Sequence, residues 1–223
     1  MNNAGKISAS IMCANWLNIG GDLIELEKAG VDYLHIDIMD GHFVPNITIG
    51  FDLCRQMAHV SDIKRDIHLL MDKPGRFISD FNIGKGEMLS VHAEANPDFV
   101  TISRCVRERE ALFGVALNPE TKIETVEKYL DCIDFIVVMM IKPGFAGLPM
   151  ENGMVEKITS VRKYLDKNGS KNIFIEVDGH VGFTNAGDMR KAGADIFVAG
   201  TSSVFNPKNS ISNGVERLRE TVK

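Results

Sequence analysis

Two polar side chains interrupt a strand-like run near the start of the sequence. Residues 33 to 39 are apolar or aromatic except for His35 and Asp37. Side chains two residues apart point to the same face of a strand, about 6.6 Å from each other. The turn-forming residues at 40–46 place this pair at the carboxyl end of the strand. Because polar groups are costly to bury unsatisfied, the pair is predicted either to hold one cation or to satisfy itself and the nearby backbone.

Polar residues also stand in or at the ends of other predicted strands. They are Ser10, His68, His92 and Asp178. Each of them alone is as readily a satisfied core or turn residue, but in barrel enzymes the catalytic groups collect at the carboxyl ends of the strands. Two imidazoles and two carboxylates together suit one divalent metal ion, such as Zn²⁺, Mn²⁺, Fe²⁺ or Co²⁺. The four candidate metal ligands are His35, Asp37, His68 and Asp178.

Two glycine-rich segments in the last third of the chain predict a phosphate site. Segment 179–182 follows the seventh predicted strand, and segment 199–203 follows the eighth. Loops of this kind that lead to helix N-termini offer backbone N–H groups and hydroxyls to a phosphate. The alternative is that the glycines only make tight turns. Since both segments stand at the expected positions of a barrel, we predict a phosphorylated small-molecule substrate.

Segment 142–149 holds two prolines and two glycines around one aromatic residue, Phe145. It predicts either a lid with hinges at its ends, which would close over a substrate, or a long surface loop. Methionines at the ends of predicted strands could line the same site, because a thioether offers no competing proton. These methionines are Met39, Met71, Met139 and Met140.

Short apolar runs alternate with longer amphipathic segments along the whole chain. The predicted strands are Ile7–Met12, Tyr33–Met39, Ile67–Met71, Met88–His92, Leu112–Leu117, Phe135–Ile141, Ile173–Val177 and Ile196–Ala199. The predicted helices lie near residues 17–29, 50–60, 75–82, 98–109, 121–131, 152–168, 184–192 and 208–221. This alternation favours an α/β fold of the (β/α)8 TIM barrel type over an open doubly wound sheet.

Composition narrows the class of protein. The chain has 223 residues, a net charge of -5 and no linker-like segment, so we expect one domain over residues 1–223. The charge gives no reason to expect nucleic acid or a membrane as partner. The absence of a signal peptide or of roughly 18 consecutive apolar residues predicts a cytoplasmic protein. The scattered cysteines predict neither a thiolate zinc site nor a disulfide framework. Since barrels of this size commonly self-associate, we expect a homo-oligomer, either a dimer or a hexamer.

Several segments, in order along the chain, resemble the ribulose-phosphate 3-epimerase family. They are HIDIMDGHFVPN at 35–46, PGFAG at 143–147, EVDG at 176–179 and VAGTS at 198–202. The similarity runs from residue 8 to residue 205, and the first segment is highly specific. Within the family, GFAG and GTSSVFN look closer to the D-allulose-6-phosphate 3-epimerase branch than to the pentose enzyme.

The resemblance implies a phosphate-binding barrel in which the four candidate ligands hold one divalent metal ion. It also implies that Asp37 and Asp178 form an acid/base pair. The residues implied to contact the sugar phosphate are Ser10, Met39, His68, Met139, Gly144, Gly147, Gly179, His180, Gly200, Thr201 and Ser202. The sequence departs from the family pattern at Leu70, Met140, Lys142, Leu148 and His180. These departures leave open the length of the substrate and the geometry of its phosphate.

Epimerisation beside a ketone removes a proton from one face of a carbon and returns one to the other face. Two carboxylates on different strands could do this, one as base and one as acid, while a metal ion stabilises the enediolate. We therefore predict a metal-dependent 3-epimerase that interconverts D-ribulose 5-phosphate and D-xylulose 5-phosphate, or D-allulose 6-phosphate and D-fructose 6-phosphate. The alternatives are a metal-dependent hydrolase of a phosphorylated sugar, a metal-free barrel isomerase or lyase, and a non-catalytic sugar-phosphate binding protein.

Overall fold

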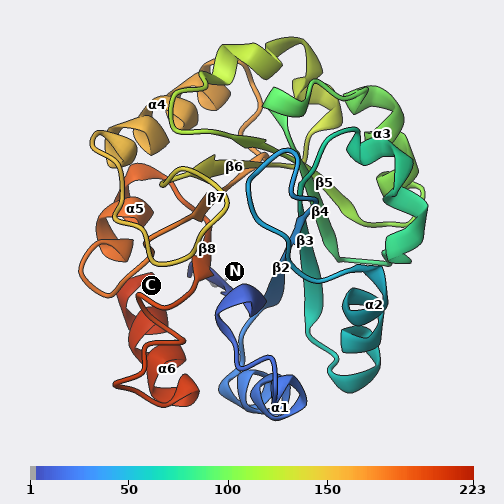
Figure 1. Cartoon of the computed structure of the whole chain (residues 1–223). Helices are drawn as coiled ribbons and strands as arrows, with labels where there is room; N and C mark the ends of the chain where they lie inside the picture. The colour runs from blue at the N-terminus through green and yellow to red at the C-terminus, as the bar shows by residue number, and fades with distance from the viewer. Residues whose placement is uncertain (1–3) are drawn as a thin grey trace.

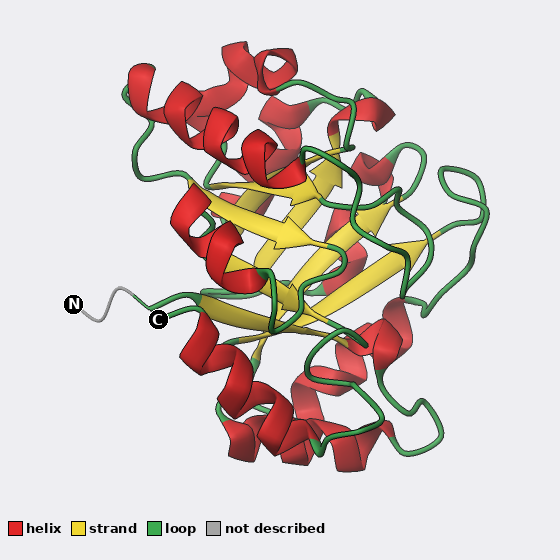
Figure 2. Cartoon of the chain, turned by 90° about the vertical axis from the view of Figure 1, so that its left-hand side faces the viewer, coloured by secondary structure: helices red, strands yellow, loops and turns green. Residues whose placement is uncertain are grey.

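A barrel of parallel strands forms the centre of the molecule, and helices cover its outside (Figures 1 and 2). The computed structural model describes residues 4–223. Its strands are β1 Lys6–Ser10, β2 Tyr33–Met39, β3 Lys64–Leu70, β4 Met88–His92, β5 Leu112–Leu117, β6 Phe135–Met139, β7 Phe174–Asp178 and β8 Ile196–Ala199. Each strand pairs with the next, and β8 pairs with β1. This closure confirms the predicted (β/α)8 barrel and excludes the open sheet.

Two kinds of helix connect the strands. The α-helices are α1 Ile19–Ala29, α2 Phe51–Val60, α3 Phe99–Arg107, α4 Met154–Lys167, α5 Ala186–Ala192 and α6 Ile211–Thr221. The 3-10 helices are η1 Ile11–Cys13, η2 Pro74–Arg76, η3 Ile78–Phe81, η4 Ala93–Ala95 and η5 Ile123–Cys132. None of these helices is long and apolar enough to cross a membrane.

The predicted bounds of β2, β4, β5 and β8 match the structure, but two predicted helices differ from it. Segment 121–131 forms η5, and segment 75–82 forms the short helices η2 and η3. Lys73 and Asn82 have φ values of 52° and 47°, and these left-handed residues stop the helical path on both sides of η2 and η3. The carbonyls of Phe81 and Asn82 accept hydrogen bonds from the buried Arg65 at 3.1 and 3.0 Å. The Arg65 side chain of β3 therefore donates to carbonyls that would have accepted backbone N–H groups in a longer helix.

Apolar side chains form an outer layer between strands and helices and a smaller cluster inside the barrel. The inner cluster consists of Tyr33, Met88, Ala116, Phe135, Val137, Met139 and Ile196. Gly114 on β5 makes room for it, because a Cβ at this residue would lie 2.3 Å from Cζ of Phe135. Buried polar side chains from β1 to β4 and from β7 occupy the rest of the interior.

Candidate active site

Three strands each present a pair of polar side chains to the barrel interior. The pairs are His35 and Asp37 on β2, Asp66 and His68 on β3, and Glu176 and Asp178 on β7. Because residues two apart share a face of a strand, both members of each pair point inward. The register of β2 and β3 sets His35 beside Asp66 and Asp37 beside His68. The interior therefore contains an upper polar layer at the carboxyl ends of the strands and a lower one beneath it.

The four candidate metal ligands meet at the upper layer, where His35 of the lower layer reaches Asp37 and Asp178 with its Nε2. Nε2 of His35 lies 3.3 Å from Oδ1 of Asp37 and 3.7 Å from Oδ2 of Asp178. Nδ1 of His68 lies 3.2 Å from the same oxygen of Asp37 and 3.7 Å from the same oxygen of Asp178. One ligand atom from each residue thus lies within 4.8 Å of the other three.

This cluster fits a divalent cation. Nε2 of His35 is buried and has no hydrogen-bond partner among residues 4–223, although it faces two carboxyl groups. A buried polar atom without a partner is costly, and a metal ion at the centre of the cluster would satisfy it. Two imidazole nitrogens and two carboxylate oxygens are also a donor set that binds divalent transition metals.

Asp66, beside His35 in the lower layer, fixes the orientation of the His35 ring. Oδ2 of Asp66 accepts hydrogen bonds from the hydroxyl of Ser8 and from Nδ1 of His35, both at 2.7 Å. A proton held on Nδ1 leaves the lone pair of Nε2 directed at the metal cluster. Glu176 lies 3.3 Å from the same Nδ1, and burial together with the charge of Asp66 raises its pKa well above the usual value.

Sequence reasoning missed these three supporting residues. Ser8, Asp66 and Glu176 each stand two positions before a predicted site residue. The signal was therefore available, because the strand period of two puts such neighbours on the same face. It was overlooked because attention went to the ends of the strands, where a substrate has access.

Asp37 and Asp178 have pKa values displaced in opposite directions. Burial alone would raise the pKa of Asp37, but the charges of and hydrogen bonds from His35 and His68 outweigh burial and lower it below the usual range. Burial raises the pKa of Asp178, and repulsion from Asp37 adds to this effect against the attraction of His35. Paired carboxyl groups whose pKa values are driven apart are suited to separate acid and base roles.

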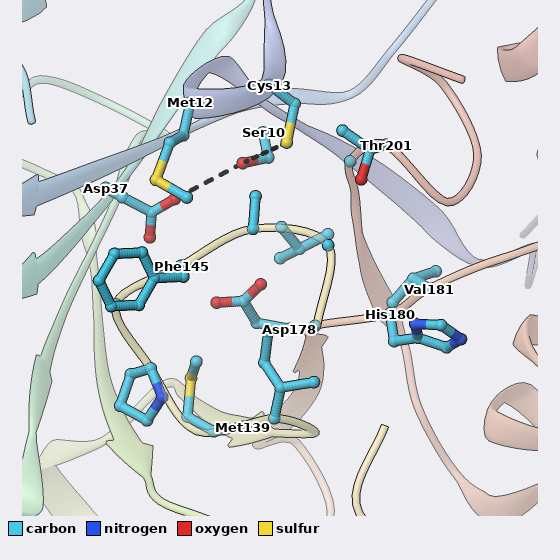
Figure 3. Close-up of a pocket in the computed structure, with 18 of the residues that line it drawn as sticks. Ser10, Met12, Cys13, Asp37, Met139, Phe145, Asp178, His180, Val181 and Thr201 are labelled. Atoms are coloured by element: carbon cyan, nitrogen blue, oxygen red, sulfur yellow. Dashed lines mark hydrogen bonds between the residues drawn. The ribbon is translucent and has the colours of Figure 1, made fainter. Parts of the chain in front are cut away.

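A cavity opens above this cluster (Figure 3). Figure 3 shows Asp37 from β2 and Asp178 from β7 pointing into it. The predicted substrate residues that line it are Ser10, Met39, Met139, Gly144, Gly147, Gly179, His180, Gly200, Thr201 and Ser202. His68 is completely buried beneath the cavity and is not part of its wall. The structure adds Met12 and Cys13 from η1, which no sequence signal marked.

The two glycine-rich loops lie along the cavity, but helix termini do not. Gly179 has a φ of 108°, and a Cβ there would lie 2.5 Å from Cγ1 of Ile141, so this turn requires glycine. The helix α5 begins only at Ala186 and α6 only at Ile211. The loops do lead to the two predicted helices, but turns intervene, so the N-termini of these helices are not among the residues that line the cavity. Residues of both loops line the cavity instead.

The segment 143–149 is a loop that is anchored near both ends. Nδ2 of Asn46 donates a hydrogen bond to the carbonyl of Gly144 at 2.7 Å, and Nδ1 of His180 donates one to the carbonyl of Leu148 at 3.0 Å. Phe145, between these anchors, is one of the residues that line the cavity (Figure 3). His180 and Leu148, two departures from the family pattern, are thus direct partners.

The methionine prediction is only half right. Met39 and Met139 line the cavity, whereas Met71 and Met140 pack in the outer apolar layer. Successive side chains alternate between the two sides of a strand, and this alternation turns the latter two away from the interior. Leu70, which precedes Met71, lines the cavity in its place.

His92, at the end of β4, connects His68 to a carboxylate. Its Nε2 lies 3.0 Å from Nε2 of His68, and its Nδ1 lies 3.1 Å from Oε2 of Glu94. Burial lowers the pKa of His92 to about 4, although Glu94 opposes this shift. Burial alone would raise the pKa of Glu94, but hydrogen bonds from His92, Thr121 and the N–H of Asn118 lower it to about 2. Sequence reasoning noted His92 as a strand-end residue but missed Glu94.

The chain matches a family model and several named proteins. The model described as the ribulose-phosphate 3 epimerase family matches residues 6–205. A ribulose-phosphate 3-epimerase of Bacillus subtilis (strain 168) is 38% identical over 88% of this chain and 91% of its own length. The chloroplastic ribulose-5-phosphate-3-epimerase of Arabidopsis thaliana is 38% identical over 91% of this chain and 72% of its own length.

More distant solved structures share the fold alone. A thiamine phosphate pyrophosphorylase from Pyrococcus furiosus covers 99% of this chain and 96% of its own with a TM-score of 0.63, at 14% identity. The match to the family model, in contrast, spans the whole barrel and every candidate ligand. The chain is therefore an isomerase that belongs to the ribulose-phosphate 3-epimerase family.

Proposed function

We propose that this protein is a metal-dependent 3-epimerase of a ketose phosphate and that Asp37 and Asp178 are its acid/base pair. The observation that carries the proposal is the placement of these two carboxyl groups. They come from β2 and β7, point into the same cavity and both approach the imidazoles of His35 and His68 within 3.7 Å. Two-base epimerisation requires such an arrangement, because the proton leaves one face of the carbon and returns to the other.

The chemistry follows from the two carboxyl groups. One carboxylate takes the proton from C3, and the electron pair of the C–H bond enters the conjugated enediolate. The other carboxyl group, protonated, donates its proton to the opposite face of C3. The pKa values of the two groups are displaced in opposite directions, which suits one of them to act as base while the other acts as acid, and the roles exchange in the reverse direction.

The remaining cavity residues would orient and protect the substrate. A divalent cation held by His35, Asp37, His68 and Asp178 would act as a Lewis acid that stabilises the negative charge of the enediolate. The thioethers of Met39 and Met139 line the cavity and offer this anion no proton. The hydroxyl of Ser10, 3.5 Å from Oδ2 of Asp37, is placed to contact the substrate.

The phosphate would be bound at the two glycine-rich loops and the anchored segment. Gly147, Gly179, His180, Gly200, Thr201 and Ser202 all line the cavity. Their backbone N–H groups and hydroxyls would hold the phosphate while the loop 143–149 excludes water. The names of the similar proteins favour D-ribulose 5-phosphate as the substrate. The segments GFAG and GTSSVFN favour D-allulose 6-phosphate, so both sugars enter the test.

Proton NMR in D₂O tests this function. Protein reconstituted with Zn²⁺, Mn²⁺, Fe²⁺ or Co²⁺ is offered ribulose 5-phosphate and allulose 6-phosphate separately, with and without a chelator. We expect deuterium at C3 together with the epimer, loss of both on chelation, and a higher rate for the true substrate. Full activity after complete metal removal would support the metal-free isomerase. Release of inorganic phosphate without exchange would support the hydrolase, and binding without turnover would support the sensor.

A further inference from the structure

The imidazole of His92 has contacts on both ring nitrogens that the proposed proton transfers do not use. It is completely buried at the end of β4. The rings of His92 and His68 are 4.9 Å apart between centroids and inclined by 22°, and Phe43 packs against His92 at a centroid distance of 4.9 Å. His92 is thus held between a candidate metal ligand and an aromatic ring of the β2 loop, with no access to the substrate cavity.

The protons in this chain of contacts can be arranged in one consistent direction. Nδ1 of His68 faces the metal cluster, so in a metal-bound protein its lone pair is committed there and the ring proton is on Nε2. That proton is donated to Nε2 of His92, 3.0 Å away. The proton of a neutral His92 is then on Nδ1 and is donated to Oε2 of Glu94 at 3.1 Å. A neutral imidazole has one donor and one acceptor nitrogen, so each bond fixes the next.

Glu94 is itself held in place from the neighbouring strand. Its other oxygen, Oε1, accepts hydrogen bonds from the N–H of Asn118 at 2.9 Å and from the hydroxyl of Thr121 at 2.5 Å. Both donors belong to the segment that follows β5. Oε2 is thereby left for His92, and the carboxylate cannot turn away without losing two hydrogen bonds. The network thus links the carboxyl ends of β3, β4 and β5.

The two imidazole ligands differ in how they are supported. His35 donates from Nδ1 directly to the carboxylate of Asp66 at 2.7 Å. His68 contacts no carboxylate through Nε2 and reaches one only through His92. Metal-binding histidines usually donate their second N–H to a carboxylate or carbonyl, which fixes the tautomer and the orientation of the ring. Glu94 is therefore to His68 what Asp66 is to His35, a supporting carboxylate, but it acts through the imidazole of His92.

We propose that His92 and Glu94 are positioning residues that hold His68 in the tautomer with its proton on Nε2 and its Nδ1 lone pair directed at the metal. The inference rests on the proposed metal site. It assigns a role to two side chains that do not touch the substrate and whose effect would reach the reaction only through His68.

We call the chain of hydrogen bonds from His68 through His92 to Glu94 the relay. The Glu94→Gln variant tests the relay because it reverses the direction of these hydrogen bonds. The oxygen of the new side-chain amide would accept from Asn118 and Thr121, so its NH₂ group would face His92. His92 would then carry its proton on Nε2, and His68 would be driven to the tautomer with a proton on Nδ1, its ligand atom. We expect the Kd for Zn²⁺, measured by competition with a chromophoric chelator, to rise about 10- to 100-fold.

The control is Glu110→Gln, which removes the charge of an exposed glutamate paired with Lys85 at the surface. Its Kd should match that of the wild type. Long-range ¹⁵N–¹H NMR of the wild-type, Zn²⁺-loaded protein tests the proton positions without a variant. We expect His68 protonated on Nε2 and His92 protonated on Nδ1.

The outcomes separate the relay from the proposed function. A His92 ring protonated on Nε2 in the wild type, or an unchanged Kd in a folded Glu94→Gln variant, would overturn the relay. Failure of the wild type to bind any divalent ion would instead overturn the metal-dependent function on which the relay rests. With C3 exchange as a second readout, Glu94→Gln should regain wild-type kcat at saturating Zn²⁺ to the extent that the metal is restored.

Discussion

At the scale of single residues, one carboxylate oxygen of Asp37 lies close to both imidazoles of the candidate metal cluster. Oδ1 lies 3.3 Å from Nε2 of His35 and 3.2 Å from Nδ1 of His68. Asp178 is more open, with 15% of its side chain exposed, and its pKa is raised where that of Asp37 is lowered. Two residues of the same type thus have pKa values displaced in opposite directions, because their surroundings differ.

The first prediction concerns this pair. Asp37→Asn and Asp178→Asn should each lower turnover by about 10²- to 10⁴-fold, because an amide can neither take up nor return the proton. Deuterium NMR should still detect exchange at C3 of one epimer in the Asp178→Asn variant, since one base remains. The exposed Asp52→Asn variant is the control. Near wild-type epimerisation in either active-site variant would rule out a two-base mechanism.

At the scale of elements, the loop 143–149, which follows β6, is held to the loops after β2 and β7 by one hydrogen bond each. Asn46 anchors it at Gly144, and His180 anchors it at Leu148. His180 makes its anchor from a backbone φ of 55°, a left-handed conformation that costs about 1 kcal/mol or more outside glycine. The hydrogen bond of His180 to Leu148 offsets part of this cost.

The second prediction tests the Asn46 anchor. Asn46→Asp keeps the acceptor for the N–H of Ile47 but loses the donor to Gly144. We expect KM for the sugar phosphate to rise about 2- to 10-fold, the equivalent of one net hydrogen bond, and the loop to be cut faster by proteases. Asn168→Asp removes a like amide-to-carbonyl bond, to Tyr164 on α4, and should leave KM unchanged. Equal KM values for both variants would show that the anchor has no role in substrate binding.

The third prediction concerns Arg65, which holds the end of the segment 75–82, where short 3-10 helices replace the predicted α-helix. Arg65 is 3% exposed and pairs with Glu87 through two contacts of 2.6 Å. Arg65→Leu leaves this buried carboxylate unpaired and should lower the free energy of unfolding by about 3–5 kcal/mol in urea titrations. Arg55→Leu, which breaks an exposed pair with Asp52, should cost less than about 1 kcal/mol. A similar loss in both variants would contradict a special role of Arg65.

At the scale of the whole molecule, the barrel divides its interior between packing and chemistry. The apolar cluster takes its side chains from β2, β4, β5, β6 and β8, and the polar layers take theirs from β1 to β4 and β7. Packing within the apolar cluster stabilises the strands. This stabilisation offsets the cost of burying the polar side chains. The predicted homo-oligomer and the single domain stay predictions, which light scattering and the cooperativity of unfolding would test.

The fourth prediction addresses this packing. Gly114→Ala places a Cβ 2.3 Å from Cζ of Phe135, and we expect overpacking to lower the free energy of unfolding by about 1–3 kcal/mol. Gly20→Ala, on α1 with no atom within 4 Å of the new Cβ, should instead raise it by about 0.5–1 kcal/mol. If the two alanines had equal effects on urea unfolding, Gly114 would not be needed for the inner cluster.

Local patterns in the amino-acid sequence were enough to predict the fold class and the four candidate ligands. Strand period and strand ends are local properties, so His35, Asp37, His68 and Asp178 could be picked out before their strands were placed. The groups that support these ligands could be identified only from the folded barrel. Asp66 reaches His35 through the register of two strands, and Glu94 reaches His68 through a third. Such contacts depend on barrel closure and side-chain direction, which a linear pattern does not contain.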